Sequence, residues 1–282
     1  MSETAPAPPS NSDLPARFTA AIVMVAVAIA AIYFGGWPFR LLAAAAAGVM
    51  IAEWAGMHRL GKGWRWIGAI ALALVLLAAA QWLYPVGEVD EVGGIEAIAG
   101  DSFTPMWRGF GLVAALAVLF GLATRRLSMG WGMLYIGIPA FALMVLEWAR
   151  FDLVFWLMLV TWATDIFAYF AGRAIGGPKL APRISPNKTW AGLIGGMAGA
   201  AVVGAVAAWL FELDPIFTFA GALMGLVAQL GDLYESRVKR RLGVKDSGTI
   251  LPGHGGVLDR LDGLLPVVLV TLMLLLVILG AL

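Results

Sequence analysis

Long apolar runs are the feature that most constrains how this chain can fold. Hydrophobic residues make up 61% of its 282 residues, which is more apolar surface than one soluble core can bury. A helix needs about 20 apolar residues to cross the hydrocarbon core of a bilayer, and the runs approach this length without the two-residue alternation of barrel strands. They therefore predict an all-α, polytopic integral membrane protein with about nine transmembrane helices. The runs cover roughly residues 17–34, 40–57, 66–84, 109–124, 130–147, 152–171, 190–210, 215–232 and 263–281.

Composition divides the chain into four regions. Residues 1–16 are rich in Ser, Pro and Ala and predict a disordered cytoplasmic tail. Residues 17–107 predict an N-terminal transmembrane region of about three helices, and residues 108–150 predict the middle transmembrane helices. Residues 151–282 contain the dense polar sequence, so we expect there a catalytic transmembrane region with active-site loops in the cytoplasm.

Basic residues are concentrated in alternate loops. Lys and Arg cluster within residues 58–65, 125–126, 173–188 and 237–260, whereas the loops at 88–101 and 212–214 carry acidic residues. Because basic loops stay on the cytoplasmic side, this pattern places the N-terminus inside and the C-terminus outside. We expect a multi-pass protein of the cell inner (plasma) membrane whose active site faces the cytoplasm.

The chain contains no cysteine and two histidines. Disulfides, thiolate catalysis and cysteine-ligated metals are therefore excluded, and two histidines are too few for a histidine-rich metal site.

Two pairs of acidic residues frame the last polar block. Asp232 closes an apolar run, where an acid costs at least about 2.5 kcal/mol, so it needs a compensating cation or metal. Asp259 and Asp262 are three residues apart at the entrance to the final run, and Asp232 and Glu235 have the same spacing. Two such carboxylate edges facing each other would suit Mg²⁺, which takes one or two carboxylates and leaves positions for substrate phosphates. One metal, two metals, or a metal with a monovalent cation all remain open.

A glycine-rich segment lies between these acidic pairs. Gly248, Pro252, Gly253, Gly255 and Gly256 are incompatible with a regular helix, and glycine lets backbone N–H groups approach a phosphate closely. The alternative is a basic loop that only fixes topology and touches anionic lipid.

A second polar block precedes it. Asp165, Tyr169, Gly172 and Arg173 share one helix face, which leads from an intramembrane acid to an arginine at the water boundary. Residues 185–189 (Ser-Pro-Asn-Lys-Thr) predict a helix start, which with Lys188 would bind phosphate. The alternative is an internal Asp165–Arg173 pair and ordinary capping. For the other intramembrane acids, Glu53 and Glu147, pairing or interfacial solvation is the favoured interpretation.

At these two blocks the sequence resembles the phosphatidate cytidylyltransferase (CDP-diglyceride synthetase) family. The upstream block is similar to the family's Asp…Ala-Tyr…Gly-Arg and Ser-Pro-Asn-Lys-Thr segments. The family's downstream signature is filled at each specified place by Ser236, Val238, Lys239, Arg240, Lys245, Asp246, Gly248, Leu251, Pro252, His254, Gly255, Gly256, Val257, Asp259, Arg260, Leu261 and Asp262.

The resemblance implies a reaction and its substrates. CTP and phosphatidic acid would give CDP-diacylglycerol and pyrophosphate with Mg²⁺ at the bilayer surface, without nucleic acid and in a chain that could act as a homodimer. We expect Asp232 and Asp259 as principal metal ligands, with Asp262 and Asp246 assisting. The expected catalytic residues are Asp232, Asp259, Asp262, Asp246, Lys245 and His254. The expected substrate-binding residues are Asp165, Arg173, Ser185, Lys188, Ser236, Lys239, Arg240, Gly255, Gly256 and Arg260.

Three other functions compete with this one. A transporter or channel would use Asp165 and Asp232 to carry protons or ions, but the chain shows no paired repeats of broken helices. An enzyme that exchanges the headgroup of CDP-diacylglycerol would carry a dense Asp-Gly…Ala-Arg…Gly…Asp…Asp run, which the sequence lacks. A lipid or polyprenol kinase that uses CTP has overlapping nucleotide and metal requirements.

Overall fold

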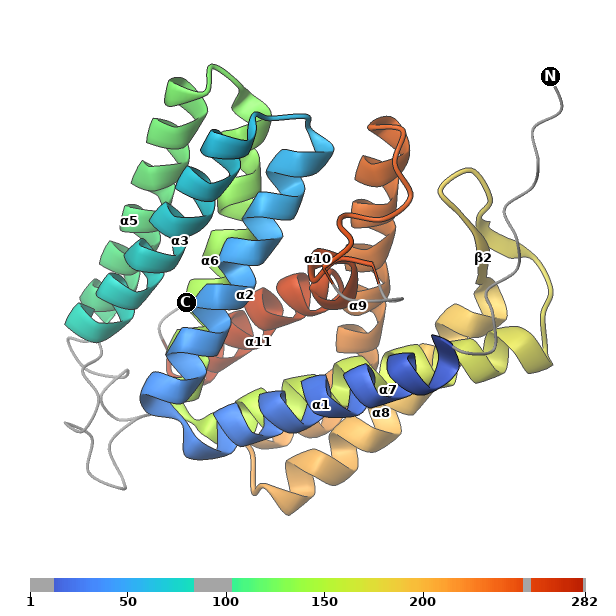
Figure 1. Ribbon diagram of the computed structural model, residues 1–282. Coiled ribbons are helices and arrows are strands. Elements are labelled where there is room, and N and C mark those ends of the chain that lie inside the picture. The colour runs from blue at the N-terminus through green and yellow to red at the C-terminus, as the bar shows by residue number, and fades with distance from the viewer. Residues whose placement is uncertain (1–12, 84–102, 251–254, 281–282) are drawn as a thin grey trace, which may run out of the picture.

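Each predicted apolar run forms a helix in the computed structural model, which describes residues 13–83, 103–250 and 255–280 (Figure 1). Seven helices in this part of the chain are long and apolar enough to cross a membrane, while the apolar stretches Ile22–Phe34 and Leu264–Ile278 are shorter. The prediction of an all-α polytopic membrane protein is confirmed, and the number of spans stays a prediction. The helices are α1 (Asp13–Phe34), α2 (Gly36–Met57), α3 (Lys62–Leu83), α5 (Phe103–Ala123), α6 (Leu127–Ala149), α7 (Phe151–Ala174), α8 (Trp190–Leu210), α9 (Pro215–Arg241), α10 (Leu258–Leu261) and α11 (Leu264–Ile278).

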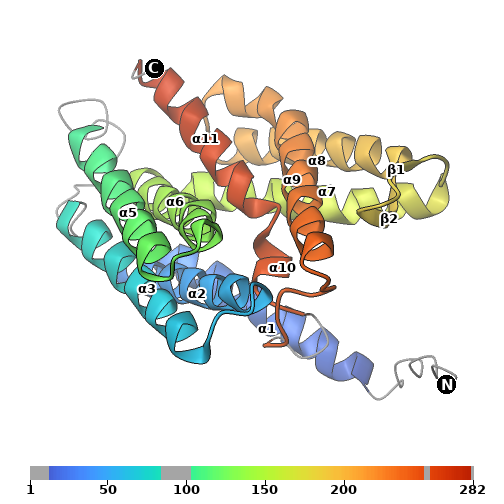
Figure 2. The same ribbon diagram turned by 90° about the horizontal axis from the view of Figure 1, so that it is seen from above.

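The helices form two groups that meet along α11. Helices α2, α3, α5 and α6 pack together in one group, and α7, α8 and α9 pack together in the other (Figures 1 and 2). Helix α11 contacts α6 on one side and α7 and α9 on the other, and α1 contacts both α2 and α7. Buried apolar side chains from both groups belong to one continuous cluster, so the N-terminal helices share a core with the polar C-terminal region.

Small residues let the helices of the second group approach closely. A Cβ atom added to Gly221 of α9 would lie 2.4 Å from the carbonyl oxygen of Ala200 in α8, and one added to Gly196 would lie 2.9 Å from that of Thr164 in α7. Such backbone contact is the usual way that membrane helices associate, because lipid gives no hydrophobic drive between them. This packing places α7, α8 and α9 around the polar residues described below.

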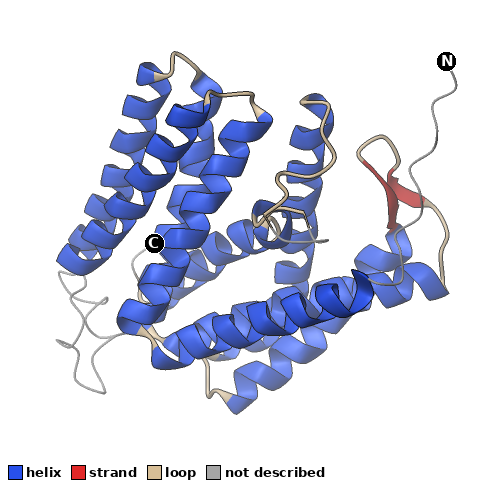
Figure 3. Cartoon of the chain, in the orientation of Figure 1, coloured by secondary structure: helices blue, strands red, loops and turns tan. Residues whose placement is uncertain are grey.

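A β-hairpin connects α7 to α8, and here the predicted helix start is wrong. Strands β1 (Lys179–Ala181) and β2 (Ser185–Thr189) pair in antiparallel fashion, with Lys179 opposite Thr189 (Figure 3). Proline disfavours helical backbone in the residue before it, which keeps Ser185 extended. Helix α8 begins only at Trp190, where the Thr189 hydroxyl caps it by accepting a hydrogen bond from the N–H of Gly192 (3.0 Å).

The predicted tail, residues 1–16, lies mostly outside the described residues, and α1 already begins at Asp13. The acidic loop at 88–101 lies outside them as well. The four predicted regions therefore stay predictions.

Candidate functional site

A polar cavity of about 630 Å³ opens between the second helix group and the hairpin. Helix α7 contributes one wall, β2 and the start of α8 another, and α9 the third. The cavity is lined by Asp165, Ala168, Tyr169, Gly172, Arg173, Asn187, Lys188, Thr189, Gly192, Leu193, Gln229 and Asp232. Four predicted site residues therefore meet here: Asp165, Arg173, Lys188 and Asp232.

Lys188 and Asp232 form an ion pair at the edge of this cavity. The Lys188 ammonium also donates a hydrogen bond to Gln229 Oε1 (2.9 Å), and the Ser236 hydroxyl donates to Asp232 Oδ1 (3.1 Å). The Asp232 side chain is 35% exposed, so a ligand in the cavity can reach it. The compensating cation that an acid at this depth requires thus comes from the hairpin, 44 residues earlier in the chain.

The predicted polar face of α7 lines the same cavity. Arg173 donates a hydrogen bond to the Tyr169 hydroxyl (2.8 Å). Asp165, deeper in the helix, lies within the electrostatic reach of Asp232, Lys188 and Arg260. The cavity therefore combines basic and acidic groups, as a site for a metal-bound polyphosphate would require.

A second polar cluster surrounds Asp259 in α10. Lys239 of α9 pairs with Asp259 Oδ1 and with Glu235 Oε2 (2.9 Å). Asp259 Oδ2 accepts hydrogen bonds from the Ser247 N–H (2.9 Å), the Ser247 hydroxyl (2.9 Å) and the Gly256 N–H (2.8 Å). Burial opposes ionisation of Asp259, but the Lys239 ammonium and these N–H groups outweigh it, so the pKa of Asp259 is lowered.

Two glycines near Asp259 in the sequence contact its carboxylate in the structure. Gly255 has φ +83°, a conformation that favours glycine, and an added Cβ would lie 2.7 Å from Asp259 Oδ2. Gly256 donates its N–H to the same oxygen. Their predicted role in phosphate binding stays a prediction, and their observed role is to organise the turn that carries Asp259.

Asp262 lies close to two other acids. Burial and the negative charges of Asp232 and Glu235 raise the pKa of Asp262, which the Gly263 N–H offsets only in part. The buried Oε1 atom of Glu235 has no hydrogen-bond partner among the described residues. A hydrogen bond between Glu235 and Asp262 contributes to the same rise in the pKa of Asp262, and carboxylate oxygens gathered in this way fit a divalent cation in their chemistry.

The metal ligands are nevertheless not preassembled. No group of three His or acidic side chains in the described part of the chain is arranged to hold a metal ion. Both oxygens of Asp259 are engaged by Lys239, Ser247 and Gly256. Asp232 is engaged in the same way by Lys188 and Ser236, so the assignment of Asp232, Asp259 and Asp262 as metal ligands stays a prediction.

Some predicted residues do not line the cavity. Arg240 donates hydrogen bonds to the carbonyl oxygens of Ile184 (3.3 Å) and Val244 (3.4 Å), which ties the hairpin to the end of α9. Ser185 lies in β2, and Lys245 and Asp246 are exposed on the turn after α9. His254 lies outside the described residues.

Sequence reasoning missed other polar residues of the site. Asn187 and Gln229 line the cavity, and Ser247 binds Asp259 from a place that the family signature leaves unspecified. Glu53, assigned only to pairing or solvation, accepts three hydrogen bonds from residues 247–258. The one sequence feature that could have identified Glu53 as a site residue is that it is an acid inside an apolar run.

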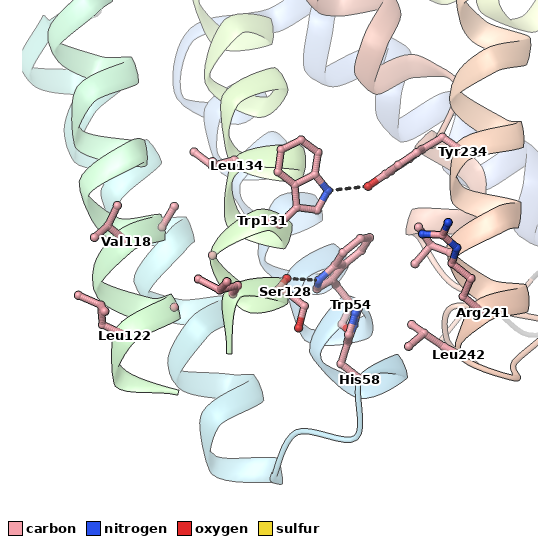
Figure 4. Close-up of a pocket in the computed structure, with 15 residues that line it drawn as sticks. Trp54, His58, Val118, Leu122, Ser128, Trp131, Leu134, Tyr234, Arg241 and Leu242 are labelled. Carbon is pink, nitrogen blue, oxygen red and sulfur yellow. Dashed lines mark hydrogen bonds between the residues drawn. The ribbon is translucent and has the colours of Figure 1, made fainter. Parts of the chain in front are cut away.

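An apolar cavity, also of about 630 Å³, lies on the opposite side of α9, between that helix and α2, α5 and α6 (Figure 4). Trp131 donates a hydrogen bond to the Tyr234 hydroxyl (2.5 Å), and Trp54 donates to the Ser128 carbonyl oxygen (2.9 Å). Most of its other lining is aliphatic, including Val118 and Leu122. This lining suits hydrocarbon, which leaves the polar cavity as the candidate site for charged substrates.

Comparison with known proteins shows the family of the chain. Residues 15–278 match the model of the cytidylyltransferase family. A phosphatidate cytidylyltransferase of Brucella abortus biovar 1 (strain 9-941) is 39% identical over 272 residues, which cover 90% of each chain. The protein of that name from Pseudomonas aeruginosa is 34% identical over 261 residues, covering 88% of this chain and 92% of that protein. The one from Rickettsia bellii is 42% identical over 123 residues, covering 39% of this chain and 53% of that protein.

Proposed function

This chain belongs to the cytidylyltransferase family, and on that premise we propose that its polar cavity is where CTP meets phosphatidic acid. The chain is a membrane-bound nucleotidyltransferase that forms CDP-diacylglycerol for phospholipid biosynthesis. The observation that carries the placement is the Lys188–Asp232 pair, which sets a cation and a half-exposed acid in one cavity between α7, α9 and the hairpin.

The reaction makes modest demands on the protein. A phosphate oxygen of phosphatidic acid forms a bond to the α-phosphorus of CTP, and the bond from that phosphorus to the bridging oxygen of the β-phosphate breaks, releasing pyrophosphate. The attacking oxygen is already ionised at neutral pH, so no strong general base is required. The protein must align the two phosphates and offset their negative charge.

The cavity residues match these demands. Lys188 and Arg173 would bind phosphate oxygens, and Asn187 and Gln229 would orient them by hydrogen bonds. Asp232 and Asp262 would hold Mg²⁺, which when bound supplies positive charge at the transferred and departing phosphates. Lys239 and Asp259 would keep the adjoining loop in place.

The competing functions differ in the products that they make. A CTP-dependent lipid kinase would move the γ-phosphate, an alcohol exchanger would consume CDP-diacylglycerol, and a transporter would make no lipid product. The position of the label in CTP therefore separates them.

We expect label from the α-phosphate of CTP to enter the lipid fraction when purified protein, phosphatidic acid and Mg²⁺ are combined in detergent micelles. Label on the γ-phosphate should appear only in pyrophosphate. Chelation of Mg²⁺ by EDTA should reduce transfer to the background of a protein-free sample, because charge on the polyphosphate is then uncompensated. Lipid labelled from the γ-phosphate would instead identify a kinase.

The location in the cell inner membrane and the cytoplasmic orientation are part of the proposal. Lys and Arg lie in alternate loops, and both the turn after α9 and the hairpin belong to the basic side. Assembly as a homodimer stays a prediction, which the mass of the protein in detergent would test.

The orientation can be tested because the chain has no cysteine. A cysteine at Thr249, an exposed position, should react with a membrane-impermeant maleimide in inside-out vesicles and not in intact spheroplasts. A cysteine at Glu212, exposed in the loop between α8 and α9, should show the opposite pattern. Labelling of Thr249→Cys from outside would invert the proposed topology.

A further inference from the structure

Glu53 of α2 is a buried carboxylate whose partners all lie far away in the sequence. Its side chain is among the buried polar groups, with the residue 5% exposed. Oε1 accepts a hydrogen bond from the Val257 N–H (2.9 Å), and Oε2 accepts one from the Leu258 N–H (2.9 Å). The Ser247 hydroxyl lies 3.2 Å from Oε2. In the described part of the chain, no basic side chain forms a salt bridge with it, so backbone N–H groups and a hydroxyl satisfy this buried carboxyl group.

Two glycines make room for this carboxylate. A Cβ atom added to Gly248 would lie 2.7 Å from Glu53 Oε1 and 2.9 Å from its carboxyl carbon. A Cβ atom added to Gly256 would lie 2.6 Å from Glu53 Oε2. Real Cβ atoms essentially never approach so closely, so both positions require glycine as long as Glu53 is in place. The small residues of this segment are thus explained by a side chain of the N-terminal helix group.

Ser247 links Glu53 to the cluster around Asp259. Its hydroxyl lies 2.9 Å from Asp259 Oδ2 as well as 3.2 Å from Glu53 Oε2, and its single proton can serve one of them at a time. The Ser247 N–H also donates to Asp259 Oδ2 (2.9 Å). Asp259 in turn pairs with Lys239 of α9. Glu53 is therefore connected to α9 through two residues.

The positions of the bonded groups show what Glu53 constrains. Val257 and Leu258 immediately precede Asp259, and the Leu258 side chain is fully buried. Their N–H groups begin the short helix α10, which packs against α2. A carboxylate that accepts these two N–H groups fixes where α10 starts and thereby where the Asp259 carboxylate points.

We propose that Glu53 is a positioning residue for cytidylyl transfer, through which the N-terminal helices hold α10 and its Asp259, the partner of Lys239, in register with the polar cavity. The inference rests on the proposed function only in assigning this loop to the transfer site. Glu53 itself touches neither substrate. Its role is comparable to that of groups that orient metal or phosphate ligands, whose loss costs about 10- to 100-fold in activity.

The first test compares Glu53→Gln with Glu147→Gln. Glu147 of α6 is a matched control, because it is also buried (8% exposed) and also accepts a backbone N–H, that of Gly36 (2.8 Å). Gln keeps one acceptor oxygen, which is enough for the single N–H at Glu147, whereas at Glu53 its NH₂ group faces the N–H of Val257 or Leu258 whichever way the amide is turned. Glu53→Gln should lower kcat about 10- to 100-fold with a smaller change in the KM for CTP, whereas Glu147→Gln should change kcat less than threefold.

Hydrogen exchange supplies a readout that does not depend on activity. The measurement uses intact protein in detergent micelles. The backbone amides of the peptide that contains Val257 and Leu258 should exchange faster in Glu53→Gln than in wild type, whereas their exchange rate in Glu147→Gln should equal that of wild type. Unchanged exchange at these amides would overturn the proposal, as would a kcat that falls equally in both variants. If wild-type protein transfers no label while Glu53→Gln still speeds exchange, the proposed function fails and the anchoring by Glu53 stands.

A double-mutant cycle tests the fit of Gly248 against Glu53. Gly248→Ala alone should lower kcat, because its methyl group displaces the carboxylate. In a Glu53→Ala background that space is vacant, so adding Gly248→Ala should cause no further loss. If instead the fold-losses in kcat of the two single variants multiply in the double variant, Gly248 does not act through Glu53, and the argument from packing is overturned.

Discussion

Asp232→Asn is expected to lower the rate of cytidylyl transfer about 10²- to 10³-fold, the usual cost of removing a preorganised electrostatic group from a transition state. Asparagine has the same shape as aspartate, so the Ser236 hydroxyl can keep its acceptor. The amide carries no charge, however. It can neither pair with Lys188 as an anion nor hold a divalent cation beside Asp262. The measurement is kcat at saturating CTP and Mg²⁺, followed by label entering lipid.

Asp152→Asn is the matched control for this loss. Asp152 also forms a salt bridge, with Arg150 (2.8 Å), but at the opposite end of α7 from Arg173. The same chemical change there should leave kcat within about twofold, since surface ion pairs contribute about 0–1 kcal/mol. Activity of Asp232→Asn close to that of Asp152→Asn would remove Asp232 from the transfer site.

Lys239→Met is expected to destabilise the fold by about 3–5 kcal/mol, because it leaves two buried acids without their cation. The Glu235 side chain is fully buried and that of Asp259 is 7% exposed, and Lys239 contacts both. Methionine preserves the length and apolar stem of lysine, so packing changes little. Thermal unfolding in detergent, followed by circular dichroism, should show a clear drop in Tm relative to wild type.

Arg237→Met provides the comparison on the same helix. Arg237 is exposed on α9, two residues from Lys239, so its replacement removes a charge without leaving a buried acid. Its Tm should stay close to that of wild type, since such surface changes are usually within about 0.5 kcal/mol. An equal drop in Tm for Lys239→Met and Arg237→Met would mean that the ion pairs of Lys239 with Glu235 and Asp259 do not stabilise the fold.

The membrane helices could be predicted from sequence because a single physical requirement determines them. Backbone groups in hydrocarbon must be satisfied within a helix or a closed barrel, so an apolar run of sufficient length has few alternatives. The need of Asp232 for a cation follows from the same cost of charge at depth. That Lys188 supplies it depends on the hairpin, whose Ser-Pro-Asn-Lys-Thr strand has a composition equally typical of a helix start.

Contacts across the chain could not be predicted in this way. Glu53 and Leu258 are 205 residues apart, and no local pattern relates a glutamate in an alanine-rich helix to the N–H of a distant short helix. The pattern of Asp259 and Asp262 indicated a metal cage by spacing alone. In the structure Asp259 is oriented by Ser247, Gly256 and Lys239, which is a consequence of tertiary packing.

Helix α9 is the common wall of the polar and the apolar cavities. Gln229 and Asp232 face one, whereas Tyr234, Val238 and Arg241 face the other. Because one helix lines both cavities, a tilt of α9 would change the shape of the polar and the apolar cavity together. On the proposed function, a bulkier residue at Val238, on the apolar side of α9, would change nucleotide binding without contacting the nucleotide.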